Sequence, residues 1–109
     1  LMTPLIPKEA LRLWEEGRYW EVHEALESLW MGFSGHDREL LQGVILLAAA
    51  LHKAKTNPRG GWRNFNKARK HLEWIPEQYK GVWVAELLQE VKQALEVPGY
   101  LPRFPLQSP

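Results

Sequence analysis

The fold is decided by residues 39–51, which read Glu-Leu-Leu-Gln-Gly-Val-Ile-Leu-Leu-Ala-Ala-Ala-Leu. Nearly every position in this stretch is apolar or small, so a helix formed by it has almost no side that favours water. A helix that is apolar all round lies at the centre of its domain. Gly43 and the alanines at 48–50 allow neighbouring backbones to approach it closely. The stretch therefore predicts a central apolar helix over about residues 37–55.

Four more segments carry apolar residues at helical spacing, which predicts helices over about 8–16, 19–30, 61–74 and 82–96. Gly17, the stretches 32–35 and 57–61, and Pro76 end these segments or form loops between them. No stretch alternates apolar and polar residues as a half-buried strand does, so no strand is expected. The sequence thus predicts an all-α, compact single-domain bundle of about five helices.

Length and composition narrow the class of protein. The chain has 109 residues, which suits one domain with a single core. We expect this helical domain to cover 1–109, with 1–7 as an extended lead-in and 98–109 as a proline-rich C-terminal tail. The longest apolar run, residues 44–51, is too short to span a bilayer, and the absence of cysteine excludes disulfides and thiolate sites. We therefore expect a cytoplasmic protein that does not enter a membrane.

The most chemically specific stretch is residues 19–30, Tyr-Trp-Glu-Val-His-Glu-Ala-Leu-Glu-Ser-Leu-Trp. On a helix, His23 and Glu27 lie four residues apart on one side, at the edge of the apolar stripe and between Trp20 and Trp30. Burying such groups without partners is costly, so both must find partners. One interpretation is a structural network in which His23 bonds to Glu27 or to a backbone carbonyl.

The second interpretation is a divalent metal site, because a His and a Glu at this spacing can bind one ion. His52, on the central helix, is the candidate third ligand, since an antiparallel pairing of helices brings it level with His23. A metal-dependent hydrolase would then use Glu24 as its general base. Gln42 is either a structural amide or a group that orients a ligand, which makes His23, Glu24, Glu27 and Gln42 the candidate catalytic residues.

Charge is unevenly distributed along the chain. Residues 9–39 hold eight acidic and three basic side chains, whereas residues 40–72 hold seven basic side chains and no acidic one. This pattern predicts a basic surface over residues 53–70 that could bind nucleic acid or another polyanion through Arg59, Arg63, Lys67 and Lys70. A net charge of +1 does not favour nucleic acid, however. The alternative is a solvated face that balances the acidic half within one chain or across a symmetric dimer.

Aromatic residues and the other histidines complete the expectations. The chain has six tryptophans, and we expect most of them in the core. Trp62, beside the predicted loop at 57–61, is the one expected to be exposed. His36 and His71 are expected to be solvated.

Two segments resemble the domain-of-unknown-function 309 family. They read Trp-Glu-Glu-Gly-x-Tyr-Trp-Glu-x-His-Glu-x-x-Glu-x-x-Trp over 14–30 and Leu-Gln-Gly-Val-Ile-x-Leu-Ala-Ala-Ala-Leu over 41–51. Members of this family are small all-helical prokaryotic proteins, so the resemblance implies the same fold over about residues 8–97. It also implies a shared site, which comprises His23, Glu24, Glu27, Trp30 and Gln42. It implies no activity.

The leading interpretation is a non-catalytic binding or assembly module that forms a homo-oligomer, a dimer. In this interpretation the His23 and Glu27 pair organises the hairpin of the two helices predicted over about 19–30 and 37–55. The alternatives are the metal-dependent hydrolase and the polyanion-binding protein. The sequence does not decide whether the protein is an enzyme.

Overall fold

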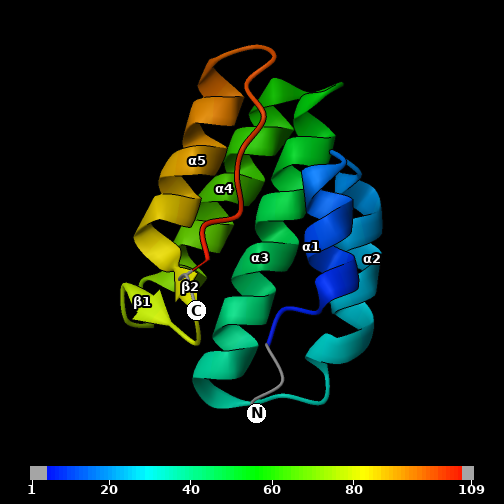
Figure 1. The fold of residues 1–109 in the computed structure, drawn as a ribbon. Helices are drawn as coiled ribbons and strands as arrows, with labels where there is room; N and C mark the ends of the chain where they lie inside the picture. The colour runs from blue at the N-terminus through cyan, green and yellow to red at the C-terminus, as the bar shows by residue number, and fades with distance from the viewer. Residues whose placement is uncertain (1–4, 107–109) are drawn as a thin grey trace.

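Five helices make up most of the computed structural model, which describes residues 5–106. Their bounds are α1 (Lys8–Glu15), α2 (Tyr19–Trp30), α3 (Gly35–Ala54), α4 (Pro58–Leu72) and α5 (Val84–Glu96). Figure 1 shows α3 in the middle, with α1 and α2 on one side and α4 and α5 on the other. The predicted all-α bundle with a central apolar helix is confirmed. The outer ends of the predicted lead-in and tail, 1–4 and 107–109, lie outside the described residues.

The central helix α3 is buried along most of its length, as its composition predicts. It packs most extensively against α4 and then against α2. Gly43 makes the contact with α4 close, because a Cβ atom at this position would collide with the side chain of Leu72. The least buried strip of α3 contains Arg38, Gln42 and Ala49 and lies along one side of the helix. No helix within 5–106 is long and apolar enough to cross a membrane.

The start of α4 differs from the sequence prediction. Residues 57–61 are predicted to form a loop, yet α4 begins at Pro58, whose fixed φ suits the first turn of a helix. The side chain of Asn57 caps the helix by accepting a hydrogen bond of 3.0 Å from the N–H of Gly60. A Cβ atom at Gly61 would lie 2.8 Å from Cβ of Ala54 on α3. Gly61 therefore serves close helix packing here, and the predicted loop is wrong.

A short antiparallel hairpin joins α4 to α5, although the sequence predicts no strand. Its strands are β1 (Gln78–Tyr79) and β2 (Val82–Trp83). Lys80 and Gly81 form the turn, and both have positive φ, 45° and 84°, as a tight two-residue turn requires. The predicted absence of strands is wrong, and α5 begins two residues later than the predicted start at residue 82.

The C-terminal tail lies along the bundle and links its two halves (Figure 1, red). The indole N–H of Trp14 on α1 donates a buried hydrogen bond of 2.9 Å to the carbonyl of Pro102. On the other side, Glu90 of α5 accepts hydrogen bonds from the hydroxyl of Tyr100 and the backbone N–H of Arg103. Near its end the tail bridges to β2 through Leu106. The tail thus holds α1 and α5 in place from outside.

Candidate functional site

The predicted pair of His23 and Glu27 is present on α2. Nε2 of His23 lies 3.2 Å from Oε2 of Glu27, as the four-residue spacing predicts. The His23 side chain is 20% exposed and that of Glu27 is 60% exposed, so the pair lies at the surface edge of the helix. Trp20 stacks on the imidazole of His23, with ring centroids 4.7 Å apart and planes inclined by 11°. His23 therefore has an indole against one face of its ring and a carboxylate beside Nε2.

His52 comes to the same region and contacts Trp20. Its ring centroid lies 5.3 Å from that of Trp20. Glu24 is exposed. Within residues 5–106, no three His, Asp or Glu side chains are grouped so that they could hold a metal ion. The structure thus brings His23 and His52 into contact with one indole, and Glu27 contacts His23.

Two buried side-chain nitrogen atoms of α2 have no hydrogen-bond partner among residues 5–106. They are Nδ1 of His23 and Nε1 of Trp30. Buried polar atoms are almost always hydrogen-bonded, so each such atom is a candidate contact for a bound group. Trp30 is the more informative of the two, because its ring also lines a hollow on the surface.

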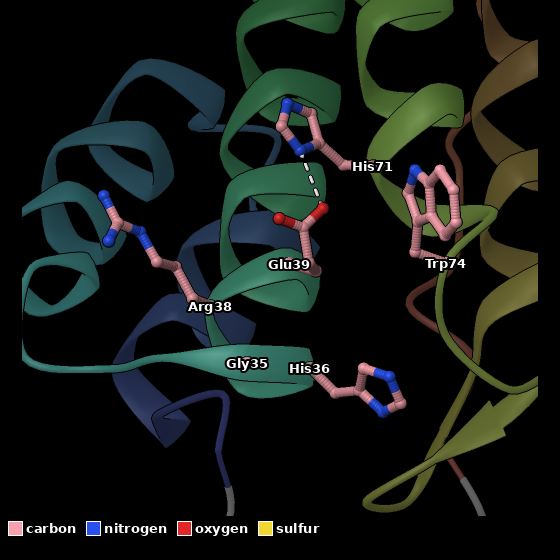
Figure 2. A pocket seen from close by; sticks show the side chains of 6 residues that line it. All are labelled: Gly35, His36, Arg38, Glu39, His71 and Trp74. Atoms are coloured by element: carbon pink, nitrogen blue, oxygen red, sulfur yellow. Dashed lines mark hydrogen bonds and ion pairs between the residues drawn. The ribbon is translucent and has the colours of Figure 1, made fainter.

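That hollow has a volume of about 510 Å³ and is called the Trp30 hollow here. It is lined by Trp30 of α2, by Arg38, Glu39 and Gln42 of α3, and by His71 of α4. A second hollow of about 540 Å³, the Trp74 hollow, shares three of these side chains and adjoins it. The Trp74 hollow is lined by Gly35, His36, Arg38, Glu39, His71 and Trp74 (Figure 2).

Of the charged side chains in the Trp30 hollow, Glu39 has an ionic partner and Arg38 has none among the described residues. The carboxylate of Glu39 is engaged by His71, whose Nδ1 lies 2.9 Å from Oε2 of Glu39 (Figure 2, dashed line). Arg38 points away from this pair, and its guanidinium carbon lies over the ring of Trp30, 4.1 Å from the centroid. None of the ion pairs among the described residues involves Arg38. The hollow therefore presents one cation without a carboxylate partner.

The sequence analysis identifies only part of this hollow. Gln42 and Trp30 are predicted site residues, and both line it. Arg38 and Glu39 are not predicted, although their position one turn before Gln42 could have indicated them. His71 is predicted to be solvated, and this is wrong, because it is half-buried and paired with Glu39. His36 is exposed, as predicted.

The predicted basic surface is present on α4. Arg59, Arg63, Lys67 and Lys70 are all exposed. None of them takes part in an ion pair within the described part of the chain. Arg69, by contrast, is paired with Glu73 at 3.2 Å.

The tryptophans are more exposed than the sequence predicts. Trp14 is buried, whereas Trp20, Trp74 and Trp83 are exposed. Trp62, predicted to be exposed, is partly buried and packs edge-on against Phe65. The expectation that most tryptophans lie in the core is therefore wrong, and three of them are available for contacts at the surface.

Comparison with known proteins agrees with this fold. The chain is similar to a conserved hypothetical protein of Thermus thermophilus, whose crystal structure is known. The two share 47% sequence identity with a TM-score of 0.76, over 84% of this chain and 99% of that one. A search among curated proteins gave no significant match. Residues 8–65 match the model of a domain of unknown function, DUF309, and the chain therefore belongs to the DUF309 family.

Proposed function

We propose that this protein is a non-catalytic binding module and that the Trp30 hollow holds its ligand, a small organic anion. The observation that carries the proposal is the position of Arg38. Its guanidinium lies over the ring of Trp30 without a carboxylate partner in residues 5–106, at the edge of a hollow. A guanidinium held in this way offers several N–H donors in a fixed plane, which suits a carboxylate or a phosphate.

The other side chains of the hollow support an anionic ligand. The one carboxylate among its lining residues, Glu39, is already engaged by His71 at 2.9 Å, so its charge does not compete fully for Arg38. Gln42 adds an amide that can donate or accept a hydrogen bond. Trp30 adds a flat apolar surface and a buried N–H that has no partner in the described part of the chain. Together these groups suit a ligand with one anionic group and an apolar body.

Tryptophan fluorescence tests this proposal, because Trp30 lies in the hollow. The protein is titrated with inorganic phosphate, short carboxylates, aromatic carboxylates and mononucleotides. We expect at least one of these anions to bind, and Arg38→Gln to weaken its binding by about tenfold or more, since a charge-assisted hydrogen bond is lost. Arg103→Gln is the matched control, because Arg103 is exposed and lines neither hollow. Equal binding by the Arg38 variant, or no binding by any member of the panel, contradicts the proposal.

Assembly is the second part of the proposed function. It is favoured by two exposed apolar residues where the end of the tail meets β2. Trp83 and Leu106 are 39% and 47% exposed. They are held close together, because the N–H of Trp83 bonds to the carbonyl of Pro105 at 3.0 Å. We expect a homodimer that covers these side chains. Sedimentation of the wild type beside Trp83→Gln tests this, and a wild type that stays monomeric at all concentrations contradicts it.

A further inference from the structure

The exposed cations of α4 lie in a single row. Arg59, Arg63, Lys67 and Lys70 follow one another at intervals of four, four and three residues. At about 100° per residue these positions fall within an arc of about 80°. At about 1.5 Å of rise per residue the row is about 17 Å long. We call these four residues the α4 row.

None of the ion pairs among the described residues neutralises the α4 row, and Glu39, the carboxylate of α3 that reaches α4, is engaged by His71. Residues 40–72 contain no Asp or Glu. The nearest carboxylate along the chain is that of Glu73, which is held by Arg69 at 3.2 Å. The row also begins in the first turn of α4, at the positive end of the helix dipole. The four side chains thus form a continuous cationic strip.

An exposed tryptophan follows the row. Trp74 lies four residues beyond Lys70, just after α4 ends at Leu72. A tight turn joins it to the helix, since its N–H bonds to the carbonyl of His71 at 3.3 Å. Its side chain is 74% exposed and forms one wall of the Trp74 hollow, opposite His36 and Arg38 (Figure 2). An indole so exposed has little to contribute to the core of its own fold.

We propose that this face of α4 binds single-stranded nucleic acid, with the α4 row contacting successive phosphates and Trp74 stacking on an unpaired base. Cations that follow a backbone beside an aromatic platform are the two elements by which proteins hold single strands without reading sequence. A membrane surface also attracts cations and exposed indoles, but an interfacial helix buries a stripe of apolar side chains in the lipid, and the exposed side of α4 has no such stripe. The inference goes beyond the proposed small-anion site and does not depend on Trp30 or Gln42.

The small net charge does not prevent such binding, because the charges are segregated. Most acidic side chains of the first half lie on α1 and α2, and Glu39 of α3, which reaches α4, is engaged there by His71 at 2.9 Å. Exposed charges farther apart than about 8 Å are largely screened at physiological ionic strength. A strand on α4 therefore experiences mainly the four local cations. We expect weak binding with a strong dependence on salt.

The test is fluorescence anisotropy with a labelled oligothymidylate of roughly 12 nucleotides. With four phosphates neutralised, affinity should fall by about 50-fold between about 50 mM and 200 mM salt. The double variant Lys67→Gln, Lys70→Gln should bind more weakly and reduce this fall to about sevenfold, because two contacts remain. The matched control is Lys8→Gln, Lys92→Gln, which removes the same charge from two exposed lysines of α1 and α5. It should bind as the wild type does.

Trp74→Ala separates stacking from charge. We expect it to weaken binding by at least about fivefold at fixed salt and to leave the salt dependence unchanged. Three outcomes overturn the inference: no binding at low salt, equal losses in the α4 and control double variants, or binding only to vesicles of anionic phospholipid. Gln42→Leu keeps the failure of the two proposals distinct, because Gln42 lines the Trp30 hollow and not the Trp74 hollow. It should weaken small-anion binding and leave binding to the oligonucleotide unchanged.

Discussion

The hydroxyl of Tyr79 on β1 donates a hydrogen bond of 2.6 Å to the carboxylate of Asp37, in the first turn of α3. Lys80, in the turn that follows, pairs with the same carboxylate at 2.8 Å. The ring of His36 also packs edge-on against Tyr79, with centroids 5.7 Å apart. The hairpin thus fixes the end of α3 that carries Arg38 and Glu39, two of the residues that line the Trp30 hollow.

The bond between Tyr79 and Asp37 predicts a dependence of stability on pH at both extremes. The hydrogen bond to Asp37 raises the pKa of Tyr79 to about 12 from an ordinary 10.0, so its contribution is full below about pH 10 and is lost as the pH rises towards 12. The hydrogen bonds from Lys80 and Tyr79 lower the pKa of Asp37 below 3.8. That contribution is full above pH 3.8 and is lost as the pH falls through the folded-state pKa.

Tyr79→Phe tests this assignment. We expect a loss of about 1–2 kcal/mol in the free energy of unfolding at neutral pH, since the Asp37 side chain is partly exposed. The alkaline decline should shrink in the same variant. Lys80→Gln is the control, because it keeps the phenol and should cost less than about 1 kcal/mol. Urea titrations across the pH range measure both, and an unchanged alkaline profile in Tyr79→Phe refutes the assignment.

Gly43→Ala should destabilise the fold through the contact between α3 and α4. The added methyl group would collide with Leu72, which is 2% exposed and has no room to move. We expect a net loss of about 1–3 kcal/mol even though alanine favours a helix. Gly32→Ala is the control, since the nearest atom to the new Cβ would lie 3.5 Å away in ordinary contact. Equal stability of the two variants would show that the helices separate without cost.

The His23 pair should act as a structural contact. His23→Ala removes the stacking on Trp20 and the contact with Glu27, and we expect a loss of about 1–3 kcal/mol. Glu27→Ala should cost less than about 1 kcal/mol, because this side chain is mostly exposed. Elemental analysis of protein purified without chelator, beside both variants, tests the metal-dependent hydrolase. One equivalent of a divalent metal that is lost in both would favour that alternative over the binding module.

Helix periodicity is readable from sequence because each helix buries one stripe, and it locates all five helices here. It fails at residues 57–61, where glycine breaks many helices but in this chain allows α4 to contact Ala54. It fails again at the hairpin, since two strands of two residues each give no periodic signal. The first failure is due to close packing between α3 and α4, which periodicity does not report. The second is due to a local turn in which Lys80 and Gly81 have positive φ.

The candidate site divides in the same way. The contact of His23 with Glu27 lies within one helix, so its four-residue spacing is enough to predict it. Glu39 and His71 are 32 residues apart, and their meeting depends on the relative placement of α3 and α4. Arg38 could be placed on α3 from the sequence, but its position over Trp30 follows from how α2 packs beside it. Contacts between helices are therefore the part that required the structure.

Trp14 should prove the residue through which the tail stabilises α1. Trp14→Phe keeps an aromatic ring against Phe104 but loses the buried hydrogen bond to the carbonyl of Pro102. We expect a loss of about 2–3 kcal/mol, because an unsatisfied carbonyl and a small void are left. Trp74→Phe is the matched control, since this residue is 74% exposed, and it should cost less than about 0.5 kcal/mol. Urea unfolding measures both variants, and proteolysis within residues 97–106 reports release of the tail. A Trp14 variant as stable and as resistant as the control would mean that the tail contributes nothing to the position of α1.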